Sequence, residues 1–211
     1  MIFSCIKDGT MTDKENIALF LKKKGLKFSN LVLCEQVHKD NINVVSEKEK
    51  GKIINSFDGL ITKEKSLLLG VIVADCLPVS FSSRDIFGIV HAGWRGIEMG
   101  IIEKIEKEIK EMGRDIKSFL FEIGPSIGPC HFEIKEDLFD KFKKYDSFIQ
   151  KRNGKIFLDL KGVVKEKIRK MGVDRVKDQN ICTFCNNNYY SFRRDNDKKR
   201  IIVINYLNNK R

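Results

Sequence analysis

The stretch HAGWRG at positions 91–96 is the feature that most limits how this chain can fold. The apolar run before it, at 87–90, is typical of a buried strand, and apolar residues at helical spacing over 97–112 predict an amphipathic helix after it. The two glycines of the stretch permit a tight turn between these elements. His91 therefore stands where a strand ends and a helix is about to begin. Reactive groups are common at such places, but a histidine there can equally serve only to complete the hydrogen bonding of a turn.

Apolar runs typical of buried strands recur along the chain, and amphipathic helical stretches separate several of them. The run at 67–74 is almost uniformly apolar, which indicates a strand covered on both faces. A helical pattern at 160–171 ends at Gly172, and the chain closes on a strand-like run at 201–206. Because no internal repeat or linker interrupts this order, we predict one mixed domain of the α/β (α+β) type over residues 1–211.

The charged residues are predominantly basic: 40 Lys and Arg against 29 Asp and Glu give a formal net charge of +11. Such a charge can attract nucleic acid or small anions. In predicted helices such as 103–110, however, lysine is interleaved with glutamate, and no basic arm or aromatic-rich basic patch is present. We therefore expect a small-molecule substrate, and we keep a basic nucleic-acid-binding protein as the non-enzymatic alternative.

The N-terminus lacks the basic start and apolar core of a signal peptide, and no apolar run approaches the roughly 20 residues that span a bilayer. Six cysteines are few for a disulfide scaffold of this length. We expect a cytoplasmic protein without membrane contact, whose cysteines form no structural disulfide. The sequence leaves the oligomeric state open between a monomer and a homodimer.

Two of the three histidines, His38 and His91, end apolar strands, and Cys76 follows the apolar run at 67–74. Histidine and cysteine are good zinc ligands, and three protein ligands would leave a fourth position for water or substrate. The three residues lie far apart in the sequence, so a site requires three strand ends to meet at one edge. The alternative is that Cys76 is buried and behaves as a small hydrophobic residue.

Two further groups of residues are chemically notable. Cys182 and Cys185 form a Cys-x-x-Cys pair, but without a second pair or a thioredoxin-like context we expect two ordinary reduced thiols. Arg193 and Arg194 beside Asp195 can either bind an anion or cap a carboxylate in the core.

Six motifs of the chain resemble, in order, those of the YfiH or laccase-domain family, whose members are named both polyphenol oxidases and purine nucleoside phosphorylases. The motifs are QVH at 36–38, DGLIT at 58–62, ADCLPV at 74–79, HAGWRG at 91–96, IGPSIGPC at 123–130 and SFRRD at 191–195. The resemblance implies a layered α/β sandwich with mixed sheets flanked by helices, similar to the catalytic domain of cytotoxic necrotizing factor.

The resemblance also implies a metal site. In the family, three motif residues hold a metal, usually zinc. By resemblance these are His38 of QVH, Cys76 of ADCLPV and His91 of HAGWRG. We therefore expect one Zn²⁺ per chain, with copper as the weaker alternative. The chain departs from the family at Cys130-His131, where many members have two cysteines, and at 7–12, where it lacks an Arg-x-Gly-Gly-Val-Ser segment. These departures bear on the choice of substrate more than on metal binding.

The predicted catalytic residues are His38, Cys76, His91 and Asp75. Asp75 is a candidate proton carrier or orienting group, or else a structural carboxylate bonded to turn amides.

The predicted substrate-binding residues are Arg95, Gln36 and Arg194. Arg95 directly follows the turn after His91, and arginine is suited to gripping phosphate through two parallel hydrogen bonds. The alternative for Arg95 is an ion pair with Asp75 that only holds the loop.

The leading functional hypothesis is a zinc-dependent enzyme of purine nucleosides. Phosphate held near Arg95 would attack C1′ of adenosine or inosine in phosphorolysis, whereas activated water would attack C6 of adenine in deamination. A second hypothesis is a hydrolase that edits peptidoglycan precursors. A third is copper-dependent phenol oxidation, which we favour least because several coppers would require many more imidazoles than the three present.

Overall fold

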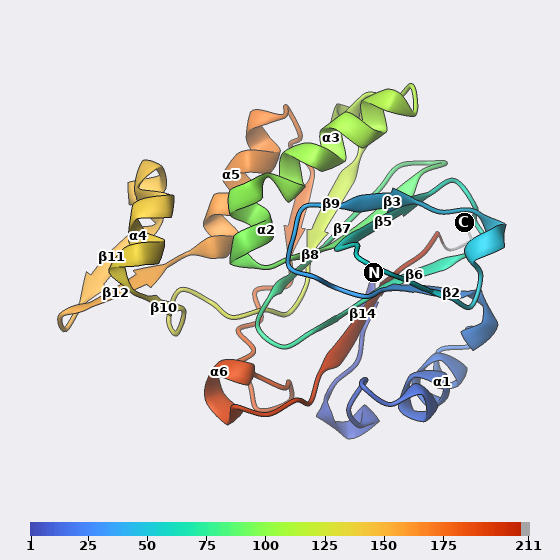
Figure 1. Ribbon diagram of the computed structural model, residues 1–211, viewed down its shortest axis with the longest axis horizontal. Coiled ribbons are helices and arrows are strands. Elements are labelled where there is room, and N and C mark those ends of the chain that lie inside the picture. Colours follow the sequence, from blue (N-terminus) through green and yellow to red (C-terminus); the bar gives the residue numbers. More distant parts are fainter. Residues whose placement is uncertain (208–211) are drawn as a thin grey trace.

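Two mixed β-sheets stacked face to face form the centre of the computed structural model, which describes residues 1–207 (Figure 1). The first sheet has five strands in the order β1-β14-β6-β2-β4, with β2 parallel to both of its neighbours. Its strands are β1 (Ile2–Phe3), β14 (Ile201–Asn205), β6 (Leu68–Val73), β2 (Leu31–Cys34) and β4 (Ile53–Ile54).

The second sheet has six strands in the order β13-β9-β7-β8-β5-β3, and its central strands β9, β7, β8 and β5 are antiparallel. Its strands are β13 (Val176–Asp178), β9 (Leu120–Ile123), β7 (Leu77–Ser82), β8 (Phe87–Ala92), β5 (Gly59–Thr62) and β3 (Ile42–Val44). Within it, Pro78 pairs with His91, and this register brings the start of β7 beside the end of β8.

The inner faces of the two sheets share one apolar layer. Leu69 and Val71 of β6 pack there with Phe87 and Ile89 of β8, and all four are fully buried. Alternate residues of each strand point to opposite faces, so both faces of these central strands must be covered. This accounts for the nearly uninterrupted apolar run at 67–74.

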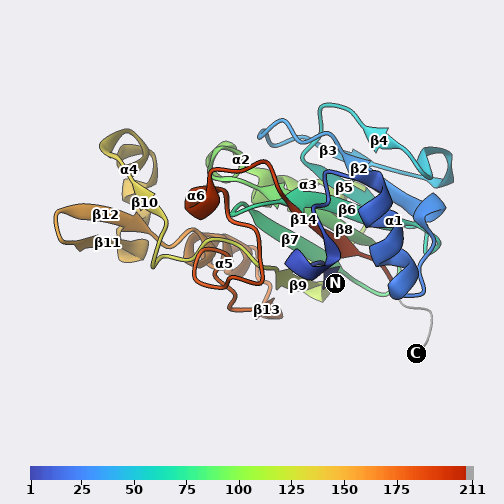
Figure 2. The ribbon, with the colours of Figure 1, turned by 90° about the horizontal axis from the view of Figure 1, so that it is seen from below.

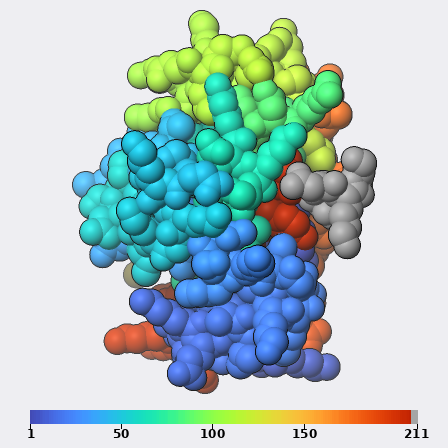
Figure 3. Space-filling model, turned by 90° about the vertical axis from the view of Figure 1, so that its right-hand side faces the viewer, coloured from blue at the N-terminus to red at the C-terminus, as the bar shows by residue number. Residues whose placement is uncertain are grey.

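Helices cover the two outer faces, which makes four layers (Figures 1 and 2). Helix α1 (Lys14–Lys23) packs Ile17 and Phe20 on the first sheet, whereas α2 (Trp94–Met99), α3 (Ile101–Glu111) and α5 (Leu160–Lys170) cover the second. Viewed from the side in Figure 3, the blue N-terminal layer and the green α3 layer lie at opposite ends of the molecule.

The remaining elements extend from this sandwich. A three-stranded sheet in the order β10-β12-β11 projects to one side together with helix α4, and helix α6 lies below the sheets in Figure 1. Their bounds are β10 (Glu133–Ile134), β12 (Lys155–Leu158), β11 (Ile149–Arg152), α4 (Glu136–Phe142) and α6 (Phe192–Asp195). Short 3₁₀ turns lie at Ile6–Asp8, Phe28–Asn30, Glu47–Glu49, Ile116–Ser118 and Lys143–Phe148.

The layered sandwich with mixed sheets and flanking helices confirms the predicted fold class. The single helix predicted over 97–112 is wrong in detail: helix α2 begins at Trp94, and Gly100 in a left-handed conformation (φ 103°) separates it from α3. Glycine adopts that backbone conformation without steric cost, so the chain can turn there between two apolar stretches. Within residues 1–207 no helix is long and apolar enough to cross a membrane.

Candidate metal centre and adjoining pocket

His38, Cys76 and His91 come together at one end of the sandwich, and their ligand atoms all lie within 4.8 Å of one another. His38 lies on the connection from β2 to β3 and Cys76 on the connection from β6 to β7, so each stands where the chain crosses from one sheet to the other. His91 is the penultimate residue of β8. The predicted convergence therefore occurs, but between the two sheets rather than at the edge of one.

Asp58, immediately before β5, organises the cluster. Its buried carboxylate lies 2.8 Å from Nδ1 of His91 and accepts hydrogen bonds from the backbone N–H groups of His38 (2.9 Å) and Lys39 (2.8 Å). One carboxylate thus orients one histidine through its ring and the other through its backbone. His38 has a left-handed backbone conformation (φ 60°). The hydrogen bonds from the backbone N–H groups of residues 37–39 to the Asp58 carboxylate hold it in place. Asp58 is the first residue of the DGLIT motif, but its role could not be predicted from the sequence.

The space around the cluster is narrow. The rings of His38 and His91 stand edge to face with centroids 4.8 Å apart. A Cβ atom at Gly93 would lie 3.4 Å from Sγ of Cys76 and 3.5 Å from Cδ2 of His38, so glycine there lets the backbone pass close to the ligands. His91 is buried, whereas His38 is exposed, and the cluster is therefore open to solvent on the side of His38.

The electrostatic environment favours the ligand form of the cysteine. Burial alone would raise the pKa of the Cys76 thiol, but the positive charge of His91 and hydrogen bonds with both histidines lower that pKa well below its ordinary value. Burial would likewise lower the pKa of His91, but the facing Cys76 thiolate and the Asp58 carboxylate raise it. Because the thiolate is the form of cysteine that binds metals, this environment prepares Cys76 for a cation.

These donors fit a transition-metal ion. With Nδ1 of His91 directed at a carboxylate, Nε2 is the nitrogen left for the cluster, which is the usual arrangement behind metal-binding histidines. Two imidazoles and one thiolate suit zinc or copper, and three protein ligands leave a coordination position open.

A pocket of about 160 Å³ adjoins Cys76. Its walls are largely apolar and aromatic, with one cationic residue, Arg193. The lining residues are Ala74, Asp75, Cys76, Gly93, Trp94, Ile127, Phe132, Leu160, Phe192 and Arg193. Two larger surface hollows, of about 420 and 470 Å³, share no residue with the metal cluster or this pocket. The small pocket can therefore place an organic molecule beside the candidate metal ligands.

Both carboxylate oxygens of Asp75 accept hydrogen bonds. Its carboxylate accepts from Oγ1 of Thr183 (2.6 Å), Oγ of Ser191 (3.1 Å) and the backbone N–H of Arg193 (2.7 Å). The backbone of Asp75 is left-handed (φ 82°), which turns the chain from β6 toward Cys76. These contacts favour the predicted orienting role, with Asp75 tying the C-terminal segment 183–193 to the residue that precedes Cys76.

The three predicted substrate-binding residues occupy different environments. Both polar atoms of the Gln36 side chain bond to the backbone of Ile72 (2.7 Å each), which favours a role in joining β2 to β6. The Arg194 guanidinium donates to the carbonyls of Thr183, Phe184 and Tyr189 and forms a bidentate pair with Asp195. These contacts give Arg194 a structural environment, but its partner Asp195 is exposed and is not the core carboxylate of the predicted capping role.

Arg95 is exposed, and its guanidinium lies 4.2 Å from the ring centroid of Trp94. Asp75 bonds to other partners, so the predicted alternative of an Arg95–Asp75 ion pair does not form. Arg193 was named from the sequence with Arg194 as an anion-binding or capping residue, but not among the substrate-binding residues. Its side chain lines the pocket and donates to the Glu133 carbonyl (3.0 Å). Its position in the SFRRD motif marked it, but only the contact with Asp75 distinguishes it from Arg194.

The fold and the cluster define a class of protein: a four-layered α/β sandwich with a His-Cys-His cluster where the chain crosses between the two sheets. The chain belongs to the family described as multi-copper polyphenol oxidoreductase laccase, whose model matches residues 4–204. This confirms the family predicted from the six motifs.

Individual relatives agree with this assignment. A protein of Aquifex aeolicus named purine nucleoside phosphorylase is 31% identical over 195 residues, which cover 89% of this chain and 91% of the relative. A Campylobacter jejuni protein with the same name is 32% identical over 180 residues, covering 83% and 76%. The crystal structure of YfiH from Bacillus licheniformis superposes with a TM-score of 0.86 at 26% identity, covering 92% of this chain and 80% of that one.

Proposed function

We propose that this protein is a zinc-dependent enzyme that cleaves adenosine and inosine with phosphate and also deaminates adenosine. The observation that carries the proposal is the open three-ligand cluster of His38, Cys76 and His91 beside a pocket with aromatic walls. The names of the Aquifex and Campylobacter relatives support the choice of substrate class.

One group of residues would bind the zinc ion, and another group would bind the purine base of the substrate. His38, Cys76 and His91 would hold the zinc ion, which when bound supplies Lewis acidity to a polar group of the substrate. Asp58 fixes both histidines, and Gly93 leaves the approach to Cys76 open.

A purine is flat and aromatic, and the side chains of Trp94, Phe132 and Phe192 in the pocket walls suit such a ring. Arg193 places a positive charge at the same pocket, and Arg95 is an exposed cation on the neighbouring Trp94. We assign phosphate binding to Arg95, because within residues 1–207 its guanidinium is held only by stacking on Trp94 and has its donors available for an anion.

The copper-dependent oxidation in the family's description is not favoured by the donor set. Within the described residues, the three histidines are divided between two clusters, one with His38 and His91 and the other with His131. Neither cluster has enough imidazoles for a multicopper centre. Zinc chemistry therefore fits these ligands better than phenol oxidation.

The proposal is tested by incubating the zinc-loaded protein with adenosine, with and without phosphate, and separating the products. Phosphorolysis of adenosine yields adenine only when phosphate is present. Deamination yields inosine without phosphate, and with phosphate it yields inosine together with the hypoxanthine that inosine releases on phosphorolysis. The Cys76→Ala variant serves as the control for contaminating enzymes. If adenosine is unchanged in both samples, the nucleoside assignment fails, and the hydrolysis of amide-linked peptidoglycan precursors becomes the next reaction to assay.

A further inference from the structure

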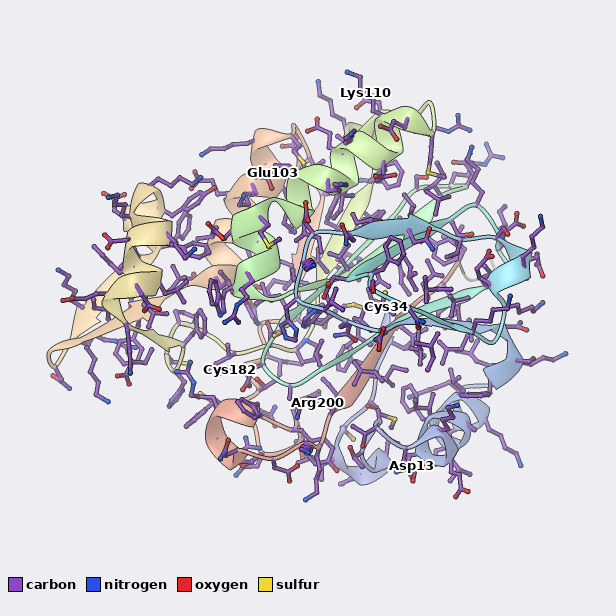
Figure 4. All side chains as sticks on the ribbon, in the orientation of Figure 1. Asp13, Cys34, Glu103, Lys110, Cys182 and Arg200 are labelled. Atoms are coloured by element: carbon purple, nitrogen blue, oxygen red, sulfur yellow. The ribbon has the colours of Figure 1, made fainter. Side chains whose placement is uncertain are left out.

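A second cluster of potential metal-binding side chains includes Cys182, whose neighbour Thr183 donates to Asp75. The four residues Cys130, His131, Cys182 and Cys185 have ligand atoms that all lie within 4.8 Å of one another. Sγ of Cys130 is 3.5 Å from Sγ of both Cys182 and Cys185, and Sγ of Cys185 is 3.2 Å from Nδ1 of His131. Figure 4 shows Cys182 just above helix α6, on the segment that leads into that helix.

These separations match the edges of a metal-centred tetrahedron. Zinc–sulfur bonds of about 2.3 Å in tetrahedral geometry place neighbouring sulfurs about 3.8 Å apart. The S–S separations of 3.5 Å are close to that edge and too long for a disulfide bond. We propose that Cys130, His131, Cys182 and Cys185 bind a second zinc ion, which is structural because four protein ligands leave no open position.

The arrangement of the sulfurs favours an ion over a disulfide. Cys130 is equally distant from Cys182 and Cys185, so no pair is singled out for oxidation, and all six cysteines of the chain are free. Three thiols and one imidazole around one point can all coordinate a metal ion. A disulfide would involve only two of the thiols and would leave the third thiol and the imidazole unused.

The surrounding backbone holds the donors in place before any ion binds. The N–H of Gly128 donates to Sγ of Cys182 (3.2 Å), a contact that suits a metal-bound thiolate. The His131 ring stacks on Phe184, with centroids 3.9 Å apart and an interplanar angle of 16°, and this fixes the direction of Nδ1. Cys130 and Cys185 are exposed, so a metal ion can reach the site from solvent.

Sequence reasoning missed this site because the Cys-x-x-Cys pair had no second pair nearby. The second pair is Cys130-His131, 52 residues before Cys182 in the chain. Backbone hydrogen bonds bring the two segments together: the N–H of Ser126 donates to Ile181 (3.2 Å), and the N–H of Thr183 donates back to Ser126 (3.1 Å). The position at which many family members have a second cysteine is occupied here by the histidine ligand.

The second ion would fasten one wall of the pocket. It would join the loop that carries Ile127 to the segment whose Thr183 side chain holds Asp75 (2.6 Å). Arg194 links this segment to helix α6. It lies in the helix beside Arg193, and its guanidinium donates to the carbonyls of Thr183 and Phe184. Loss of this ion is therefore expected to loosen the pocket without removing a ligand of the first site.

The experiment measures bound zinc by element analysis after dialysis against zinc at a concentration set by a weak chelator. The wild-type chain should hold two zinc ions, Cys185→Ser and Cys76→Ala one each, and the double variant none. Cys5→Ser, which replaces a thiol outside both clusters, should hold two. A wild-type chain with one zinc that is lost in Cys76→Ala overturns the proposal.

A second measurement does not depend on the folding of variants. Wild-type protein titrated with Co²⁺ should reach two equivalents and develop intense thiolate-to-cobalt absorption, as expected for a site with three thiolates. Thiol titration of the denatured, non-reduced protein in chelator should then find six free thiols. Saturation at one equivalent, or a count of four thiols from an oxidised pair among Cys130, Cys182 and Cys185, contradicts the second site.

Discussion

The carboxylate of Asp58 and the ring of His91 form a fully buried pair, with Oδ1 2.8 Å from Nδ1. The backbone N–H of His91 also donates to the carbonyl of Asp58 (2.7 Å), so two strands of one sheet are linked through both main chain and side chain. The same carboxylate binds the N–H of His38 on the crossing between the sheets. The geometry of two proposed metal ligands thus depends on one acidic residue that binds no metal itself.

Substitution of Asp58 by Asn tests this dependence. Asn keeps the size of the side chain but removes the negative charge that aligns His91 and supports its basicity. Loss of such a supporting carboxylate typically weakens metal binding by about 10–100-fold. Competition with a chromophoric chelator should detect this shift at the first site. Asp85→Asn, which breaks an exposed pair with Arg114, is the matched control and should leave the affinity unchanged. Equal affinities for the two variants would show that Asp58 does not tune the metal.

Replacement of Arg95 by Lys separates a substrate role from a structural one. The exposed guanidinium stacks on Trp94, and such a contact contributes only about 0.5–1 kcal/mol, so melting temperature and zinc content should change little. Lysine cannot grip phosphate through two parallel hydrogen bonds, so phosphate-dependent cleavage of adenosine should weaken more than deamination. A fall of several degrees in melting temperature, or equal loss of both activities, would instead assign Arg95 to the scaffold.

Arg194→Lys should behave in the opposite way. The guanidinium holds three backbone carbonyls and Asp195, and a lysine amine cannot satisfy all of them. We expect a loss of about 2 kcal/mol or more in the free energy of unfolding, because carbonyls of the segment are left without donors. Urea unfolding of the zinc-loaded protein measures this loss. An unchanged unfolding curve together with a raised KM for nucleoside would restore the substrate-binding role predicted from the sequence.

Asp178 forms ion pairs with both Lys161 and Lys165, and these pairs predict how the stability of the fold depends on pH. Burial alone would raise the pKa of Asp178, but the hydrogen bond from Lys165 (2.6 Å between Nζ and Oδ2), the N–H of Asn180 and the charges of both lysines lower it on balance. A carboxyl group with a lowered pKa in the folded state stabilises the fold above its unfolded pKa of about 3.9, and this stabilisation is lost as pH falls through the folded pKa.

Asp178→Asn should therefore destabilise the protein at pH 7, by about 3 kcal/mol if breaking this largely buried pair follows the usual cost. The difference from wild type should narrow as pH falls below about 4, because the stabilising charge of the wild-type carboxylate is lost as pH passes through its lowered folded pKa. Urea unfolding at pH 7 and below about pH 4 checks the prediction. The control is Asp140→Asn, which removes the acidic member of the exposed pair with Lys143. A difference that stays constant between the two pH values would contradict it.

Much of the fold was accessible from the sequence because burial leaves a periodic pattern. The apolar run at 67–74 predicted a strand covered on both faces, and β6 lies between a helix and the second sheet. The break at Gly100 was missed because the apolar stripe continues through it, and only the positive φ shows that the helix axis changes.

The site was accessible only in part. His38, Cys76 and His91 were predicted as metal ligands from their residue types and the ends of apolar runs, and the structure brings the three side chains together. The supporting residues could not be predicted, because hydrogen-bond partners such as Asp75 and Thr183 lie 108 residues apart and no local pattern records such a contact. For the same reason, sequence reasoning selected Arg194, which is saturated by backbone carbonyls, in place of Arg193, which lines the pocket.

The most direct test of the central claim relates bound zinc to phosphorolysis in one titration. Cys185→Ser is proposed to retain only the first metal site, so metal-depleted samples of this variant are loaded with increasing zinc and assayed with adenosine and phosphate. Release of adenine should rise in proportion to bound zinc up to one equivalent per chain, and Cys76→Ala should release none at any zinc concentration. Two results would contradict the assignment of His38, Cys76 and His91 as the catalytic metal centre. One is adenine release by Cys76→Ala at the rate of the wild-type protein, and the other is a rate in Cys185→Ser that does not depend on bound zinc.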